Sequence, residues 1–121
     1  MQQPIPEDSF LRSIIDNTPA AYLVIDKDFN VRFANEFIVK IAGISYDEII
    51  GKKCYLVKGN DAICKHCIVK KAFETGEKQY RLNKEIDRAG NERFNDNFGV
   101  PLLKEDGSFD YVVEILTDRT E

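Results

Sequence analysis

The fold is decided by one stretch, Pro19-Ala-Ala-Tyr-Leu-Val-Ile-Asp-Lys-Asp-Phe-Asn-Val-Arg-Phe-Ala-Asn35. Residues 22–25 are large apolar or β-branched, which suits a buried strand. Residues 26–30 are rich in Asp and Asn, whose side chains hydrogen-bond the backbone of turns. Val31 and Phe33 then alternate with polar or small residues, as in a half-buried strand. The stretch predicts two strands joined by a tight turn, which can form early because the pairing is local.

Length and composition describe one globular domain. The chain has 121 residues, of which 43% are hydrophobic, and a formal net charge of −4, so it can build a single core. The acidic balance argues against nucleic acid as a direct partner, because phosphate binding needs a basic surface. No apolar run approaches the roughly 18 residues of a membrane span, and residues 1–7 lack the pattern of a secretory signal. Three cysteines, an odd number, in a chain without an export signal predict a cytoplasmic protein. The lack of an apolar span predicts that the domain makes no membrane contact.

The N-terminal region is predicted to hold a leader and one helix. Residues 1–7 are expected to be flexible and extended, because they contain two prolines. Residues 8–121 are expected to form a single domain with its core at residues 19–121. A helix is predicted at residues 8–17, with an apolar face made by Phe10, Leu11, Ile14 and Ile15.

Capping and turn signals divide the remaining chain into helices and strands. Helices are predicted at residues 35–42, 45–50 and 62–75, and the stretch 52–60 between them is expected to be irregular. Strands are predicted at residues 79–86, 92–103 and 109–117, separated by turns that contain glycine. This order predicts an α+β fold, in which helices cover one face of a five-stranded antiparallel sheet.

Several blocks of the sequence resemble the PAS family of sensor domains. Phe10–Asn35 is similar to the opening of such a domain, and Ala42–Lys52 to its next block. Glu74–Glu77 is similar to the end of its long helix, and Val100–Ser108 and Thr117–Glu121 to its last two strands. The resemblance covers the chain from its first helix to its end. It implies the same five-stranded α+β fold, often built around a small-molecule pocket.

The resemblance also implies a role. Such domains are non-catalytic sensory and dimerising inputs of larger regulators, such as sensor histidine kinases of two-component systems, diguanylate cyclases and transcription activators. The closing Asp-x-Thr motif, here Asp118-Arg119-Thr120, passes the signal to a following helix, so we expect an output domain after Glu121. The helix at residues 8–17 is the candidate contact of a homodimer, because its apolar face can pack on a partner's sheet.

Four side chains are candidates for contact with a ligand in the implied pocket. Asn95 and Asn97 share one parity of the strand 92–103, opposite its aromatic residues, and this pattern places them on the solvent side. The alternative is that they and Asn35 line the pocket and bind polar groups of a ligand. Tyr80 belongs to an aromatic set that fits either the core or a cofactor contact.

Three hypotheses compete for the role of the cysteines Cys54, Cys64 and Cys67. They could hold a metal ion or an iron–sulfur cluster, with a fourth ligand still to be supplied. They could form a reversible disulfide as a redox switch, or a thiol oxidoreductase site, since neighbouring lysines and a helix N-terminus lower a thiol pKa. They could also be inert, apolar thiols. An enzyme is disfavoured, because the Cys-x-x-Cys pair does not follow a βαβ pattern.

Two organic cofactors are disfavoured by single residues. Cys54 stands where light-sensing flavin relatives carry a reactive cysteine, but Leu116 stands where their last strand carries a flavin-contacting Gln. Haem-binding relatives carry a histidine in the long helix, and His66 lies near the start of that helix among lysines. A lone histidine in such surroundings is typical of a solvated surface, so neither haem nor flavin is expected.

Overall fold

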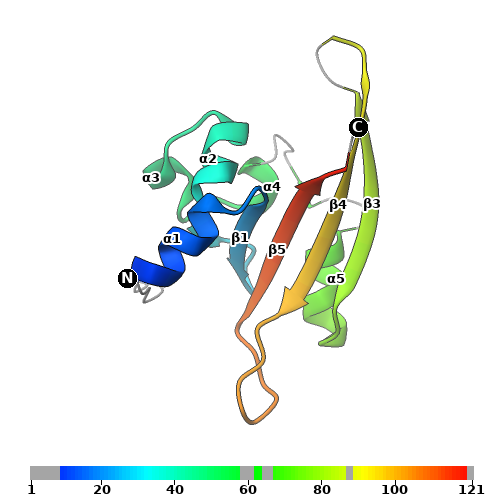
Figure 1. Ribbon diagram of the computed structural model, residues 1–121. Helices are drawn as coiled ribbons and strands as arrows, with labels where there is room; N and C mark the ends of the chain where they lie inside the picture. Colours follow the sequence, from blue (N-terminus) through cyan, green and yellow to red (C-terminus); the bar gives the residue numbers. More distant parts are fainter. Residues whose placement is uncertain (1–8, 58–61, 64–66, 87–88, 120–121) are drawn as a thin grey trace.

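A computed structural model describes residues 9–57, 62–63, 67–86 and 89–119 (Figure 1). The described strands form one antiparallel sheet in the order β2-β1-β5-β4-β3, which confirms the predicted α+β class. They are β1 (Ala21–Asp26), β2 (Val31–Ala34), β3 (Gln79–Ile86), β4 (Glu92–Pro101) and β5 (Tyr111–Asp118). The described helices are α1 (Ser9–Asn17), α2 (Glu36–Ala42), α3 (Tyr46–Ile49), α4 (Cys54–Val57) and α5 (Ile68–Thr75). The predicted leader at residues 1–7 lies outside the described residues.

The predicted hairpin is confirmed, and Asp26 organises its turn. The Oδ1 atom of Asp26 accepts hydrogen bonds from the backbone N–H of Asp28 at 3.0 Å and of Asn30 at 2.9 Å. The side chain of Asp26 is buried, with Nη1 of Arg32 3.7 Å from its Oδ2. The left-handed position of the turn is taken by Phe29, with φ 67°, rather than by one of the Asp or Asn residues that favour it.

The capping signals before α2 and α3 are also confirmed. Asn35 caps α2, and Gly43 ends that helix with φ 72°, a conformation that glycine adopts without strain. Ser45 caps α3, because Glu48 N–H donates to Ser45 Oγ at 3.3 Å. Ser45 Oγ also donates to Glu48 Oε1 at 3.1 Å, so the two residues of the predicted capping pattern are in contact. These caps set the positions of α2 and α3 beside the hairpin.

The segment from Cys54 to Cys67 differs from its prediction in two ways. The helix predicted at residues 62–75 begins only at Ile68, and Cys67 caps it in an extended conformation. Packing favours this start: Ile68, Val69 and Ala72 are buried, whereas Ile63, farther back in the chain, is 40% exposed. The stretch predicted as irregular contains the single-turn helix α4, which is too short to show a periodic pattern.

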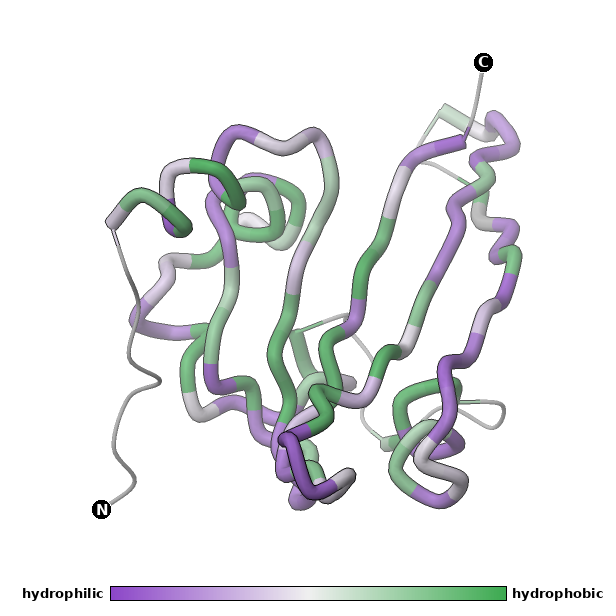
Figure 2. The backbone as a smooth tube through the Cα atoms, turned by 60° about the horizontal axis from the view of Figure 1, so that its bottom comes forward, coloured by the Kyte–Doolittle hydropathy of each residue, from purple (hydrophilic) through white to green (hydrophobic). Residues whose placement is uncertain are grey.

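The core lies between the sheet and its helices. Its fully buried residues come from distant segments and include Leu23 and Ile25 of β1, Val69 of α5 and Val112 of β5. α5 packs across β3, β4 and β5, and α2 packs on β1 (Figure 1). Hydrophobic residues are concentrated along β1 and β5, whereas hydrophilic residues predominate along β3 (Figure 2). None of the helices in the described ranges has the length and apolar content needed to cross a membrane.

Candidate functional site

The face of β4 that turns toward the helices carries its asparagines. Gly99 lies against α5: a Cβ atom at this position would be 3.2 Å from the carbonyl oxygen of Ile68. Because side chains alternate along a strand, Asn97 shares this inner face with Gly99. Asn97 is 7% exposed, whereas Phe98 on the outer face is 37% exposed. The expectation that Asn97 faces solvent is therefore wrong. α5 approaches β4 so closely that the position facing it must be Gly99, and Asn97 lies on the same face.

Two polar side chains are buried on this inner face. Asn97 pairs with Leu116 across β4 and β5, and Glu114 pairs with Gly99 two positions along. Glu114 is 0% exposed. Asn97 Oδ1 is buried and, in the part of the chain that the structure describes, has no hydrogen-bond partner. A buried oxygen without a hydrogen bond lowers the stability of the fold by about 1–3 kcal/mol. The stability of the fold alone therefore does not explain why an asparagine stands at this position.

Asn35 is buried at a different place, beside α2. Its Oδ1 accepts hydrogen bonds from Tyr22 N–H at 3.0 Å and from Ile38 N–H at 3.3 Å. Its Nδ2 donates to the carbonyls of Ile15 at 3.0 Å and of Ala20 at 2.7 Å. The side chain thus joins α1, β1 and α2, and its donors and acceptor are already engaged within the protein. Its assignment to a ligand pocket stays an untested prediction.

The other two candidates lie on opposite faces of the sheet. Asn95 is on the inner face, where its Oδ1 accepts a hydrogen bond from Asn83 Nδ2 at 3.2 Å. Tyr80 is on the outer face and 52% exposed, with its ring centroid 5.0 Å from that of Phe98. Its hydroxyl donates to Asp96, and this hydrogen bond raises the pKa of Tyr80 above its usual value. The structure therefore brings Asn95 and Asn97 to one face but not Tyr80 or Asn35.

Glu114 is the buried residue that the sequence prediction missed. The strand predicted at residues 109–117 was defined by its apolar residues, and Glu114 is the only charged side chain between Tyr111 and Leu116. The available signal in the sequence is a charged residue inside an apolar run. Such a residue is unusual, because charged residues are rarely fully buried. Which face it occupies follows only from its pairing with Leu23 and Gly99.

The cysteines are described only in part. Cys54 is 3% exposed and belongs to the buried core, and Cys67 is half-buried against the same core. Cys64 and His66 lie outside the described residues. Among the residues that are described, no three His, Cys, Asp or Glu side chains are grouped to hold a metal ion. The metal, redox and inert-thiol hypotheses therefore stay predictions.

The cap of α5 gives a direct test of one thiol. Cys67 Sγ accepts from Lys70 N–H at 3.5 Å, and a hydroxyl is a stronger acceptor at this position. We expect Cys67→Ser to raise the free energy of unfolding by about 0.5 kcal/mol and Cys67→Ala to lower it by about as much. Urea denaturation under reducing conditions measures both. A destabilised serine variant would contradict a capping role and point to the thiol itself.

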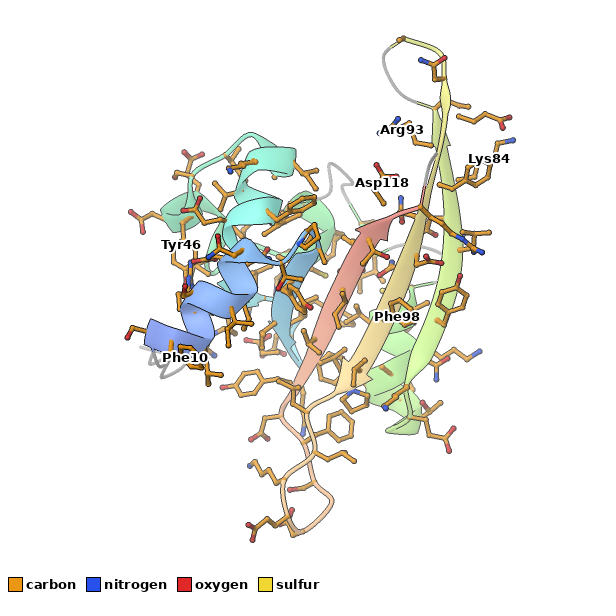
Figure 3. All side chains as sticks on the ribbon, in the orientation of Figure 1. Phe10, Tyr46, Lys84, Arg93, Phe98 and Asp118 are labelled. Carbon is orange, nitrogen blue, oxygen red and sulfur yellow. The ribbon has the colours of Figure 1, made fainter. Side chains whose placement is uncertain are left out.

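The C-terminal end of β5 is held on both faces of the sheet. On the inner face, Arg93 Nη2 lies 3.1 Å from Asp118 Oδ2 (Figure 3). On the outer face, Arg119 Nη1 lies 3.5 Å from Asp96 Oδ1. The backbone N–H of Arg119 also donates to the carbonyl of Phe94 at 2.8 Å. The chain therefore leaves the sheet while still attached to β4, the strand that carries Asn97.

Comparison with known proteins agrees with this architecture. The chain matches the family model described as the PAS fold over residues 15–121. The PAS domain of BvgS from Bordetella pertussis is 20% identical with a TM-score of 0.65, covering 93% of this chain and 85% of that one. A PAS domain from Colwellia psychrerythraea is 20% identical with a TM-score of 0.69, covering 93% and 96% of the two chains. A LOV protein from Rhodobacter sphaeroides is 16% identical with a TM-score of 0.66, covering 92% and 65%.

No curated protein matches the chain. The antiparallel sheet with its covering helices defines the class as a small α+β domain, and at these identities the solved structures support the fold alone. The family match spans most of the sequence, so the chain belongs to the PAS fold family. The resemblance drawn from the sequence is confirmed. Membership makes the chain a sensory or signalling module, a kind of domain that is generally non-catalytic.

Proposed function

We propose that this domain is a ligand-binding input that passes its signal to a C-terminal output domain of the same protein. The observation that carries the proposal is Asn97, a carboxamide 7% exposed on the inner face of the sheet, whose Oδ1 lacks a hydrogen-bond partner within the described residues. Protein interiors pair nearly all buried polar atoms. A small molecule bound between the sheet and α5 would supply the missing hydrogen bond, and the domain itself would be non-catalytic.

The contacts of β4 provide a route from such a ligand to the exit of the chain. Asn97 faces inward, and its neighbour Asp96 faces outward, where it contacts Tyr80 and Arg119. Any displacement of β4 caused by a ligand at Asn97 would therefore act on Arg119. This residue lies immediately after β5, where a following output helix would begin.

Ligand binding is tested with a library of small metabolites and a thermal shift assay. A ligand that binds only the folded state stabilises it, by about 2.7 kcal/mol at a hundred times its Kd. We expect at least one compound to raise the Tm of the wild-type chain and to lose most of this effect in Asn97→Leu. Asn17→Leu, which changes an exposed carboxamide on α1, is the matched control. A library without hits, or hits unaffected by Asn97→Leu, would contradict the proposal.

A second candidate function is self-association through α1. This helix has no buried residues, and Phe10, Leu11 and Ile14 are 72%, 56% and 49% exposed. The outer face of the sheet exposes further apolar side chains, including Tyr80, Leu82 and Phe98. A second copy of the chain could cover both surfaces at once, because each copy carries the two complementary parts.

Sedimentation over a range of concentrations tests this dimer. We expect the wild-type chain to form dimers and Phe10→Glu to weaken the association at least tenfold, since a buried unpaired charge is costly. Ser13→Glu introduces the same charge on a polar position of α1 and should leave the dimer intact. A strictly monomeric wild-type chain at the highest concentration, or equal effects of both variants, would refute the role of α1.

A further inference from the structure

The helix α1 packs on the domain largely through charged side chains. Its half-buried residues are Arg12, Ile15 and Asp16, which are three or four positions apart and therefore lie on one side of the helix. The large apolar side chains of Phe10 and Leu11 are 72% and 56% exposed. α1 lies at the edge of the molecule beside α2 and has no fully buried residue (Figure 1). An amphipathic helix usually packs by its apolar face, so the attachment of α1 depends on polar contacts to an unusual degree.

Arg12 is at the centre of this attachment. Its guanidinium carbon lies 4.7 Å from the ring centroid of Phe33 and 4.9 Å from that of Tyr46. Both distances are within the range of cation–π attraction. Its Nε also lies 2.9 Å from Oδ2 of Asp16 on the same helix. One side chain of α1 thus contacts β2 and α3 together.

Two hydrogen bonds link the end of α1 to the start of α2. Asp16 Oδ1 accepts from Glu36 N–H at 2.9 Å, and the carbonyl of Ile15 accepts from Asn35 Nδ2 at 3.0 Å. Asn35 Nδ2 also donates to the carbonyl of Ala20, a bond that does not involve α1. Both bonds to α1 become open to water once the helix moves away, so its loss leaves no buried group without a partner.

We infer that α1 undocks from the domain as a unit while the sheet stays folded, and that the contacts of Arg12 with Phe33 and Tyr46 set the balance between the docked and released states. Segments with few buried apolar contacts open at a lower free energy than the core. Only residues 18–20 separate α1 from β1, so the hinge lies there. Release uncovers the ring of Phe33, which is 7% exposed in the docked state.

The inference goes beyond ligand binding and self-association, because neither of these requires α1 to move. A partner that binds only one of two states shifts the balance between them. α1 is therefore a two-state element within this domain, and any molecule that contacts either its exposed apolar side or the uncovered rings would bias it.

Hydrogen exchange of single backbone amides, followed by NMR, tests the release of α1. Glu36 N–H reports docking directly, because its acceptor, Asp16 Oδ1, belongs to α1. We expect the amides of residues 15–17 and of Glu36 to be about 100-fold or more less protected than the slowest amides of β1 and β5. The measurement is made on the wild-type chain and on Phe10→Glu, so that a second copy does not protect α1. Equal protection of α1 and the sheet in both chains would overturn the inference, because α1 would then open only in global unfolding.

Variants on the two sides of α1 test the role of Arg12. Arg12→Met keeps the apolar stem and removes the guanidinium group, so we expect the protection of α1 and of Glu36 N–H to fall about fivefold to thirtyfold. The slowest amides of β1 and β5 should stay within about twofold. Leu11→Ala removes apolar surface from the exposed side of α1 and should change neither group. An equal effect of Leu11→Ala, or a loss of protection spread over the sheet, would overturn the inference.

A double-mutant cycle identifies the contact itself. Tyr46→Leu removes one of the two rings beside Arg12 and should also lower the protection of Glu36 N–H. The two changes together should lower it by less than the product of the single effects, since each removes the same interaction. Effects that multiply fully would contradict the contact between Arg12 and Tyr46. If Arg12→Met does not fold, the comparison of α1 with the sheet in the wild-type chain decides.

Discussion

Replacing Asn35 by Ala is expected to destabilise the domain by about 3–5 kcal/mol. The substitution removes the hydrogen bonds to Tyr22, Ile38, Ile15 and Ala20. Each buried group left without a partner costs about 1–3 kcal/mol, and some of the four will recover water. Since a domain of this kind is stable by only about 5–15 kcal/mol, the loss should be visible as a large fall in the urea midpoint.

The control for Asn35 is Asn17→Ala. Asn17 is exposed, and its Nδ2 donates a single hydrogen bond to Ser13 carbonyl at 2.7 Å. This change should stay within about 0.5 kcal/mol. If Asn35→Ala cost no more than Asn17→Ala, Asn35 would not be the joint between α1, β1 and α2, and a role in ligand contact would regain weight.

Replacing Leu23 by Ala is expected to cost about 3–5 kcal/mol. Leu23 is 0% exposed on the inner face, between Ala34 of β2 and Glu114 of β5. Truncation leaves a cavity, because the strands on either side cannot close over it, and such changes cost about 2.7–5 kcal/mol. Chemical denaturation of the reduced chain gives the value directly.

Val24 provides the comparison on the opposite face of β1. It is half-buried and pairs with Phe33 and Val113, so Val24→Ala should cost only about 1 kcal/mol. Equal losses at Leu23 and Val24 would mean that the inner and outer faces are assigned wrongly. The same error would remove the basis for placing Asn97 and Glu114 toward α5.

The parts of the fold that local chemistry determines were predictable from the sequence. Three such features depend only on residues close in sequence. They are the Asp-rich turn after β1, the cap made by Ser45 and the glycine after α2. The start of α5 was not predictable, because it depends on which residues reach the core from Ile68 onward. The local cap at Cys67 offered no strong signal, since cysteine is not a preferred capping residue.

The candidate site depended still more on distant contacts. Aromatic residues on one parity of β4 usually mark the buried face, yet Phe98 faces outward and Asn97 inward. The deciding residue is Gly99, and its importance follows from the approach of α5, which the sequence does not reveal. Glu114 shows the same limit: it stands in an apolar strand, but its burial is produced by Leu23 and α5. The sequence indicated the strands, and the packing between them determined the site.

The position of β3 at the margin of the sheet bears on how copies of this chain meet. Among the described strands, β3 pairs only with β4, so the other row of its backbone groups is a template on which a foreign strand could add. Arg81 and Lys84 stand on this strand, and Lys84 Nζ lies 2.8 Å from Glu92 Oε1. Charged side chains on a marginal strand discourage edge-to-edge growth into fibrils. These charges favour the association proposed above, through α1 and the outer face of the sheet, over addition at its rim.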